Sequence, residues 1–297
     1  MDILYMFESA AAQGLIWALL AIGVYITFKI LDIADLTVDG SICTGAVVGA
    51  VLMFNGVHPV LAAMIAFIAG CGAGFITGAL HVFFGIPAIL SGILTQMMLW
   101  SINLIILGTA NLSLPPVDNP IFSATNLLAT IGIAIAVIVG FIVLLHFFFN
   151  TELGYSLVTV GCNQDMARAQ GINVNMNKIL GLMLSNGIVA LAGCLLAKYQ
   201  GYADINMGRG AIVTGLAAIV IGQAIFAKLP KKLYIQLTGV TLGAFIFFLI
   251  NSIIVALGLP NLLKLFSALI IAVILAVPFW KRKATERRIK KVNKEAK

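Results

Sequence analysis

Apolar runs about as long as a bilayer-crossing helix recur along the whole chain, and this feature constrains the fold more than any other. Two clear examples are IGIAIAVIVGFIVLLHFFF and ILGLMLSNGIVALAGCLLA. A helix of about 20 apolar residues matches the thickness of the bilayer core. Only 10% of the residues are charged, so the chain cannot cover a water-facing surface as soluble domains do. The runs do not alternate like barrel strands. The sequence therefore predicts an all-α, polytopic helical membrane protein.

Hydropathy and helix breakers divide the chain into about nine expected spans, within a range of eight to ten. In this interpretation residues 1–280 form a single transmembrane domain, and 281–297 form a separate tail. The segments 36–54 and 201–227 are the ones most expected to be broken or re-entrant, which would change the count. The expected spans lie near 10–30, 36–54, 59–84, 87–108, 124–149, 178–199, 211–227, 233–257 and 262–280.

The tail KRKATERRIKKVNKEAK carries the whole net charge of +7, so the rest of the chain is neutral overall. A basic tail is expected to stay inside and to bind anionic lipid, which favours a cytoplasmic C-terminus. With nine spans, the N-terminus then lies outside, the loop 108–122 also lies outside, and 151–177 lies in the cytoplasm. The outside loop has no Lys or Arg. A local basic tail on a neutral body does not indicate a nucleic-acid partner.

Enzyme and metal signatures are absent from the sequence. GxxxxGK[ST], HExxH and GxSxG do not occur, so the chain does not hydrolyse nucleotide through a P-loop. The four cysteines are scattered without metal-ligand spacing. We therefore expect no catalytic residues, no metal site and no cofactor bound by this chain.

Polar residues within the expected spans are the candidates for a solute pathway. Asp35 and Asp39 are four residues apart and would share one face of a helix. A carboxylate deep in the bilayer is costly and is expected to face the bundle interior or water. The glycines and hydroxyls around Asp39 favour an irregular, pathway-lining span, and the alternative is a helix start where Asp39 caps backbone amides.

Neutral amides and hydroxyls in the other spans suit a pathway through which a polar solute passes. Each of them can equally form an interhelical hydrogen bond, worth about 0.6 kcal/mol in membrane proteins. Glycines that repeat every four residues, as at Gly70, Gly74 and Gly78, predict close helix packing. The candidate pathway residues are Asp39, Ser41, Thr44, Gln96, Asn103, Asn186 and Asn251.

The polar stretch TELGYSLVTVGCNQDMARAQGINV interrupts two long apolar runs. The Asn163-Gln164 pair is expected to start a short helix, and Gly171 to end it. Asp165 near the start and Arg168 near the end suit the helix dipole. The stretch therefore predicts one or two short, stiff helices on the cytoplasmic face.

Four short motifs follow in and after this stretch: Leu153-Gly154, Asp165-Met166-Ala167, Gly171-Ile172-Asn173 and Ala192-Gly193. The region that contains them resembles the signature region of permeases from binding-protein-dependent ABC importers of the branched-chain amino-acid type. DLTVDGSICTGAVVGA resembles the second span of a subgroup linked to aromatic amino-acid uptake. The chain departs from the family at Tyr155-Ser156-Leu157, where basic residues are usual, and at Gln223, where a glycine is frequent.

This resemblance implies a multi-pass permease of the bacterial cytoplasmic membrane. It implies a homodimer, or a heterodimer with a sister permease, above two cytoplasmic ATP-binding subunits that hold ATP and Mg. An extracytoplasmic solute-binding lipoprotein delivers the solute. In that scheme the coupling segment 151–177 is moved by the ATPase. The coupling residues that the resemblance implies are Glu152, Leu153, Gly154, Asp165, Met166, Ala167, Arg168 and Gly171.

The leading hypothesis is a permease subunit of an ATP-driven importer for an amino acid, either aromatic or branched-chain. One alternative is a sugar or nucleoside importer of the same architecture. Another is an ion-coupled secondary carrier that uses Asp35 or Asp39, and a third is a membrane scaffold that transports nothing.

Overall fold

The computed structural model describes residues 3–115, 122, 126–226, 229–230 and 232–258, and beyond these 262, 265–269, 272–273 and 276. The tail 281–297 lies outside the described residues.

The first helix, α1 (Ile3–Tyr25), continues into a π-helical turn, η1 (Ile26–Ile30). The other elements are α2 (Val38–Phe54), α3 (Pro59–Val82), α4 (Ala88–Leu107), β1 (Asn111–Ser113), α5 (Leu127–Phe149), α6 (Glu152–Cys162), α7 (Gln164–Ala169), α8 (Val174–Gln200), β2 (Tyr202–Asp204), α9 (Ala211–Ile225) and α10 (Leu233–Ala256).

The described residues contain six helices long and apolar enough to cross a membrane: Met6–Ile30, Pro59–Val82, Ala88–Leu107, Leu127–Phe149, Val174–Gln200 and Leu233–Ala256. This confirms the prediction of a helical, multi-pass membrane protein. The helices α2 and α9 are apolar but shorter, and they lie in the two segments expected to be broken. The count of nine spans and the orientation stay predictions, and the ninth expected span, 262–280, lies largely outside the described residues.

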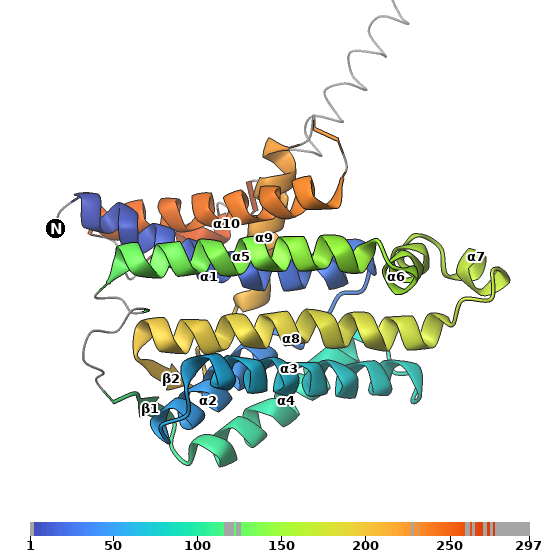
Figure 1. Ribbon diagram of the computed structural model, residues 1–297, viewed down its shortest axis with the longest axis horizontal. Helices are drawn as coiled ribbons and strands as arrows, with labels where there is room; N and C mark the ends of the chain where they lie inside the picture. Colours follow the sequence, from blue (N-terminus) through green and yellow to red (C-terminus); the bar gives the residue numbers. More distant parts are fainter. Residues whose placement is uncertain are drawn as a thin grey trace, which may run out of the picture.

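Helix α8 forms the centre of the bundle (Figure 1). It packs against α2 and α3 on one side and against α1 on the other, while α1 also packs against α9 and α10. The short helices α6 and α7 lie at one end of the bundle, and β1 pairs with β2 at the opposite end (Figure 1). These three-residue strands were not predicted, since they carry no strand pattern in the sequence, and the other described elements are helices as expected.

Glycines allow the central helices to approach closely, as their spacing predicted. A Cβ at Gly45 of α2 would overlap the carbonyl of Ala190 in α8. A Cβ at Gly74 of α3 would overlap the carbonyl of Leu182, also in α8. In lipid, apolar burial does not drive helices together, so close backbone packing of this kind stabilises the bundle.

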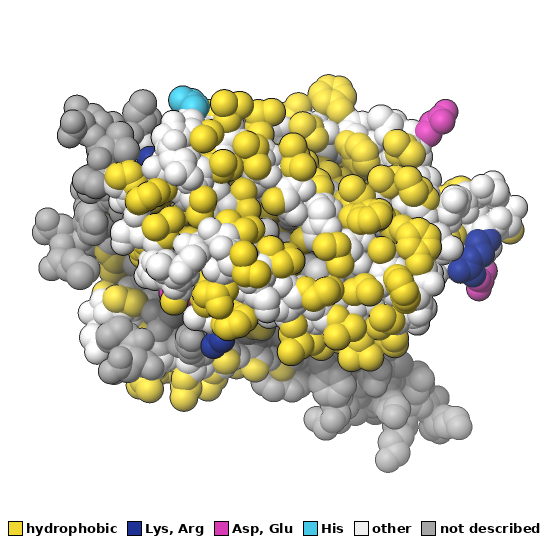
Figure 2. Space-filling view, turned by 90° about the horizontal axis from the view of Figure 1, so that it is seen from below, with side chains coloured by type: hydrophobic (Ala, Val, Ile, Leu, Met, Phe, Trp, Pro, Cys, Tyr) yellow, Lys and Arg dark blue, Asp and Glu magenta, His cyan; other side chains and the backbone are white. Residues whose placement is uncertain are grey.

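The surface of the bundle is apolar along the flanks of its long helices. Figure 2 shows hydrophobic side chains spread over one face, with charged side chains mostly at its margins. On α3 and α4, side chains such as Ile68, Met97 and Ile105 are more than half exposed. Such a surface is stable against lipid or against another apolar subunit.

Candidate functional site

The second expected span is broken before α2. The chain leaves η1 at Ile30 and runs without helix to Val38, and Asp32 has a positive φ of 55°. Asp35 lies in this non-helical segment and Asp39 lies in the first turn of α2. The expectation that the two aspartates share one helical face is therefore wrong.

Asp35 is held in a buried hydrogen-bond network. Its carboxylate accepts from the backbone N–H of Thr37 at 2.9 Å and from the Asn186 amide at 2.7 Å. The Asn186 carbonyl accepts in turn from the Ser41 hydroxyl at 2.6 Å. All four residues are buried. Ser41 and Asn186, two candidate pathway residues, thus serve to fix the non-helical segment and α2 against α8.

Asp39 joins the beginning of α2 to the beginning of α9. Its carboxylate accepts from the backbone N–H groups of Gly210 and Ile212, at 2.9 and 2.8 Å. These amides belong to the first turn of α9, so Asp39 acts as a helix cap from another element. Asp39 therefore caps backbone amides, as the alternative interpretation expected, but the helix that it caps is α9 and not its own helix, α2.

A cavity of about 280 Å³, with both polar and apolar lining residues, lies between α2, α4 and the segment that leads from β2 to α9. It brings together three of the candidate pathway residues, which are Asp39, Gln96 and Asn103. Sequence reasoning missed two further lining residues, Trp100 and Arg209. Gln96, Trp100 and Asn103 are spaced by four and three residues and so lie on one face of a helix. This spacing could have identified Trp100 as a lining residue from the sequence.

Asn103 has an unusual environment in this cavity. Its side chain is fully buried, and among the described residues its amide group meets only the Cys43 thiol, a weak partner without the geometry of a full hydrogen bond. The Cys43 thiol lies beside it but donates to the backbone carbonyl of Ile205 at 3.1 Å. Buried amides nearly always have partners, so an unsatisfied one needs a reason.

The remaining two candidate pathway residues lie outside this cavity lining. The Thr44 hydroxyl donates to the Gly40 carbonyl of its own helix at 3.0 Å. Asn251 of α10 accepts from the Ser267 hydroxyl at 2.8 Å. Both are therefore engaged in local or interhelical hydrogen bonds.

The expected coupling segment forms two short helices with caps at their starts. The Thr151 hydroxyl accepts from the Gly154 N–H at 3.3 Å and begins α6. The side-chain carbonyl oxygen of Asn163 accepts from the N–H groups of Asp165 and Met166, both at 3.0 Å, and caps the start of α7. Gly171 has a φ of 80°, a conformation that favours glycine after a helix end. Local sequence rules therefore predicted this geometry correctly.

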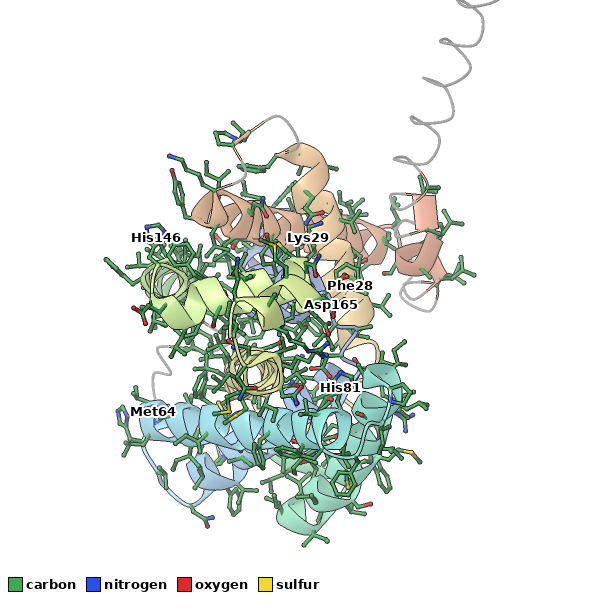
Figure 3. All side chains as sticks on the ribbon, turned by 90° about the vertical axis from the view of Figure 1, so that its right-hand side faces the viewer. Phe28, Lys29, Met64, His81, His146 and Asp165 are labelled. Carbon is green, nitrogen blue, oxygen red and sulfur yellow. The ribbon has the colours of Figure 1, made fainter. Side chains whose placement is uncertain are left out.

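The residues of the coupling segment divide into exposed and buried groups. Leu153 and Met166 are more than half exposed, and Arg168 and Asp165 form an exposed ion pair with a 3.2 Å contact. Glu152 and Gly171 are exposed as well. Asp165 is labelled in Figure 3, which looks onto this end of the molecule.

Gly154 and Ala167 are buried, so they face the molecule itself. A Cβ at Gly154 would overlap the backbone at Phe149, at the end of α5. Ala167 belongs to a small apolar cluster with Val160 and Val174. These two residues fix α6 to α5 and α7 to the start of α8.

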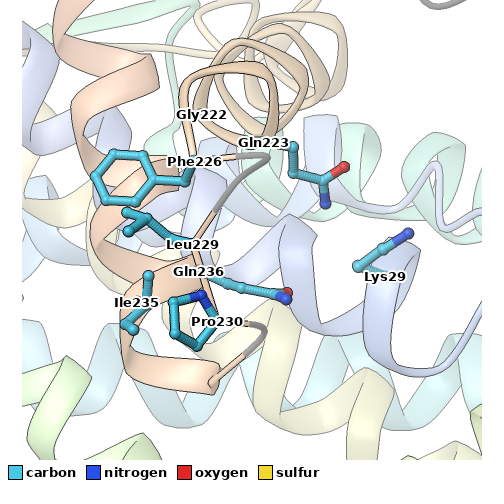
Figure 4. Close-up of a pocket in the computed structure, with 8 residues that line it drawn as sticks. All are labelled: Lys29, Gly222, Gln223, Phe226, Leu229, Pro230, Ile235 and Gln236. Carbon is cyan, nitrogen blue, oxygen red and sulfur yellow. The ribbon is translucent and has the colours of Figure 1, made fainter.

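A second cavity of about 240 Å³ lies among η1, α9 and α10 (Figure 4). Lys29, Gln223 and Gln236 provide its polar side chains. The hydroxyl of Tyr25 donates to the Gln236 carbonyl. Gln223, where the sequence departs from the family, therefore lines a cavity among the helices.

The sequence is similar to those of known transport proteins. The sequence matches the family described as "Branched-chain amino acid transport system / permease component" over residues 6–278. It is 42% identical, over 90% of both chains, to the tyrosine transport system permease protein of Clostridioides difficile. It is 27% identical to the autoinducer 2 import system permease protein LsrC of Salmonella typhimurium, over 82% of this chain and 68% of that relative.

The fold also resembles a solved transporter. A metal-chelate type ABC transporter in an inward-facing conformation matches with a TM-score of 0.52 and 17% sequence identity, over 94% of this chain and 87% of that one. The class is thus the transmembrane permease subunit of an ABC transporter, which is not itself an enzyme. The chain belongs to the family of branched-chain amino acid transport system permeases.

Proposed function

We propose that this permease forms the translocation pathway of an ATP-driven importer for an amino acid. The observation that carries the proposal is the capped, exposed pair of helices α6 and α7 at one end of the bundle. Short rigid helices of this kind transmit a displacement, whereas a flexible loop absorbs it. Because α6 follows α5 and α7 precedes α8, a push on them reaches the centre of the bundle.

The exposed residues of this segment are the proposed contacts with the ATPase. Leu153 and Met166 offer apolar surface, and Glu152, Asp165 and Arg168 offer charge. Gly154, Ala167 and Gly171 act indirectly, because they set the shape of the segment. The proposed partners are two copies of a cytoplasmic ATP-binding subunit, which holds ATP and Mg, with a second permease chain and an extracytoplasmic solute-binding lipoprotein.

An amino-acid solute is supported by the similarity to a tyrosine transport permease. The autoinducer 2 import permeases are less similar and carry another solute, so an importer for a sugar or a nucleoside is kept as the alternative. An ion-coupled carrier is disfavoured, because the carboxylates of Asp35 and Asp39 both accept hydrogen bonds that hold the fold together. We place the protein in the bacterial cytoplasmic membrane, with the C-terminus inside.

The test is uptake by proteoliposomes that contain the permease, its ATPase and its binding protein. Arg168→Glu should reduce both ATP-dependent uptake and stimulated ATP hydrolysis to background, because it reverses a charge on the exposed coupling surface. Asn55→Glu, at an exposed turn after α2, is the matched control and should leave both unchanged. Uptake that persists without the ATPase and collapses with a proton uncoupler would exclude the proposal.

A further inference from the structure

We infer that a cavity at the end of the bundle that carries α6 binds the headgroup of an anionic phospholipid, whose acyl chains lie in the groove between α5 and α10. The cavity has a volume of about 700 Å³, and its lining comes from η1, the end of α5, α6 and the start of α10. The inference goes beyond the proposed function and does not depend on the transported solute. It rests on the charge of the cavity, on its level in the bundle and on the groove that continues from it.

The charge of the lining favours an anion. Lys29 of η1 and Lys232 before α10 bring two ammonium groups to the cavity, and no Asp or Glu is among its lining residues. Among the described residues neither lysine forms an ion pair. Lys232 lies over the Tyr234 ring, with 6.0 Å from Nζ to the ring centroid, and this contact leaves the ammonium N–H donors available to a ligand. A phosphate group complements such a lining, because it offers several acceptor oxygens and a negative charge.

The cavity lies at the level where a membrane meets water. Three of the six candidate spans have an end in its lining: Met6–Ile30, Leu127–Phe149 and Leu233–Ala256. Tyr155 and Tyr234 also line it and are exposed, and tyrosine favours this boundary because its ring is apolar and its hydroxyl is polar. Figure 3 looks onto this end of the molecule and labels two of the lining residues, Lys29 and His146. Lipid headgroups therefore lie at the depth of the cavity.

A groove begins one helical turn further along the same two helices. It has a volume of about 290 Å³ and includes Ile142 of α5 and Thr238 of α10 in its lining. Ile142 lies four residues before His146, and Thr238 lies four residues after Tyr234, and both His146 and Tyr234 line the cavity. Four helical residues rise about 6 Å, so the cavity and the groove follow each other along the crevice between α5 and α10.

The groove is apolar and opens to the surface. Its two polar side chains, Thr238 and Thr241, donate their hydroxyls to carbonyl groups of α10 itself, at 2.8 and 3.0 Å. Val139 and Leu242 line it and are about half exposed. An acyl chain removes this apolar surface from water-facing or loosely packed surroundings, whereas a soluble phosphate makes no use of it. The cationic cavity and the apolar groove together therefore favour a lipid.

The bound lipid also contacts the proposed coupling helix α6. Tyr155 and Val158 of this helix line the cavity. Tyr155 is one of the positions where basic residues are usual in the family, so here an aromatic side chain faces the headgroup site. An occupied cavity holds α6 against η1 and the end of α5.

Native mass spectrometry of the purified full-length permease tests the ligand class with three probes. Dioleoylphosphatidylglycerol should bind at least tenfold more tightly than dioleoylphosphatidylcholine, which has the same chains and no net charge. Glycerol 3-phosphate, which has a phosphate and no chains, should not displace phosphatidylglycerol at equal concentration. Equal affinity for the two lipids would overturn the inference. Displacement by glycerol 3-phosphate would show instead that the cavity accepts a soluble phosphate.

Lysine variants locate the headgroup. Lys29→Gln and Lys232→Gln should each weaken phosphatidylglycerol binding about fivefold, the usual effect of one basic residue near an anionic membrane surface, and leave phosphatidylcholine binding unchanged. Lys178→Gln, in the first turns of α8 and outside the cavity lining, is the matched control and should change neither affinity. The basic tail attracts anionic lipid equally in all variants. If the control weakens binding as much as the other two, or if none of the three does, the preference has another origin and the inference fails.

Tryptophan variants locate the acyl chains. Val139→Trp fills the groove and should weaken the binding of both lipids several-fold. Leu144→Trp is the control, because Leu144 is also about half exposed on α5 but lines neither the groove nor the cavity, and it should bind both lipids normally. Should Val139→Trp not fold, Leu242→Trp blocks the groove from α10. A folded groove variant that binds both lipids like the natural protein would exclude the groove.

Hydrogen exchange shows whether the lipid reaches α6. Exchange at residues 155–162 should be several-fold slower in nanodiscs of phosphatidylglycerol than in nanodiscs of phosphatidylcholine, and Lys29→Gln with Lys232→Gln should remove the difference. Equal exchange in the two lipids would mean that the headgroup does not lie against α6, which contradicts the assigned cavity. None of these measurements needs the ATPase or a solute, so failure of ATP-dependent uptake leaves their outcome unaffected.

Discussion

The amide nitrogen of Asn186 donates to the carboxylate of Asp35 at 2.7 Å, which ties the middle of α8 to the non-helical segment before α2. Both residues are buried, so neither group has water as a substitute partner. The contact explains how a broken span stays in one position inside a helical bundle. It also leads to the first prediction.

Asn186→Leu should destabilise the permease by more than about 2 kcal/mol, because it leaves a buried carboxylate without its partner. The measurement is thermal unfolding of the purified protein in detergent. The double variant with Asp35→Leu should recover part of the loss, since both polar groups are then gone. Unchanged stability of the single variant would show that the hydrogen bond does not hold the segment.

Gly45→Ala should destabilise the packing of α2 on α8, because the added Cβ overlaps the Ala190 carbonyl. A loss of 1 to 3 kcal/mol or more is expected for overpacking of about one methyl group. Gly72→Ala is the control, since nothing lies within 4 Å of a Cβ there. The control should gain up to about 1 kcal/mol from helix propensity. Equal unfolding temperatures for the two variants would contradict the packing seen here.

Asp39→Ala should expose the first turn of α9, because two of its amides lose their acceptor. Loss of a helix cap costs typically about 1 kcal/mol. Hydrogen exchange at residues 210–213 should therefore accelerate several-fold. Asp39→Asn retains a side-chain oxygen and should restore part of the protection. If exchange in this turn does not respond to Asp39→Ala, the cap is not formed in the membrane protein.

Asn163→Ala should loosen α7 with little effect on the rest of the bundle, because the Asn163 carbonyl caps two amides of an exposed six-residue helix. The expected cost is about 1 kcal/mol of local stability. Stimulated ATP hydrolysis should fall while the unfolding temperature stays the same. Asn163→Asp keeps the cap and should behave like the natural protein. Full activity of the alanine variant would mean that the ATPase does not need a preformed α7.

The sequence predicted those features that depend on local patterns. The long helices follow from apolar runs, and α7 follows from Asn163 and Gly171, because capping and termination are properties of a few neighbouring residues. The shorter apolar helices α2 and α9 lie in the segments expected to be irregular. The helices α2 and α9 have 17 and 15 residues, and the sequence placed their starts only approximately.

Features that join distant segments could not be predicted. Sequence reasoning offered a helix start as one of two alternatives for Asp39, but its acceptor role toward Gly210 depends on how α2 meets α9. It identified Asn103 as a polar residue in a span, yet its lack of a full hydrogen bond depends on the helices around it. Arg209 carried no pattern at all, because its place beside α4 results from the chain path after β2.

The pairing of β1 with β2 has a mechanical consequence. The pairing continues in two further backbone hydrogen bonds, in which Leu114 donates to the Gly201 carbonyl and Ile205 donates to the Ala110 carbonyl. Ile205 also lines the Asp39 cavity. Residues 110–114 after α4 are therefore joined by backbone hydrogen bonds to the strand that leads into the cavity wall, and we expect a displacement of this segment to move Ile205 with it.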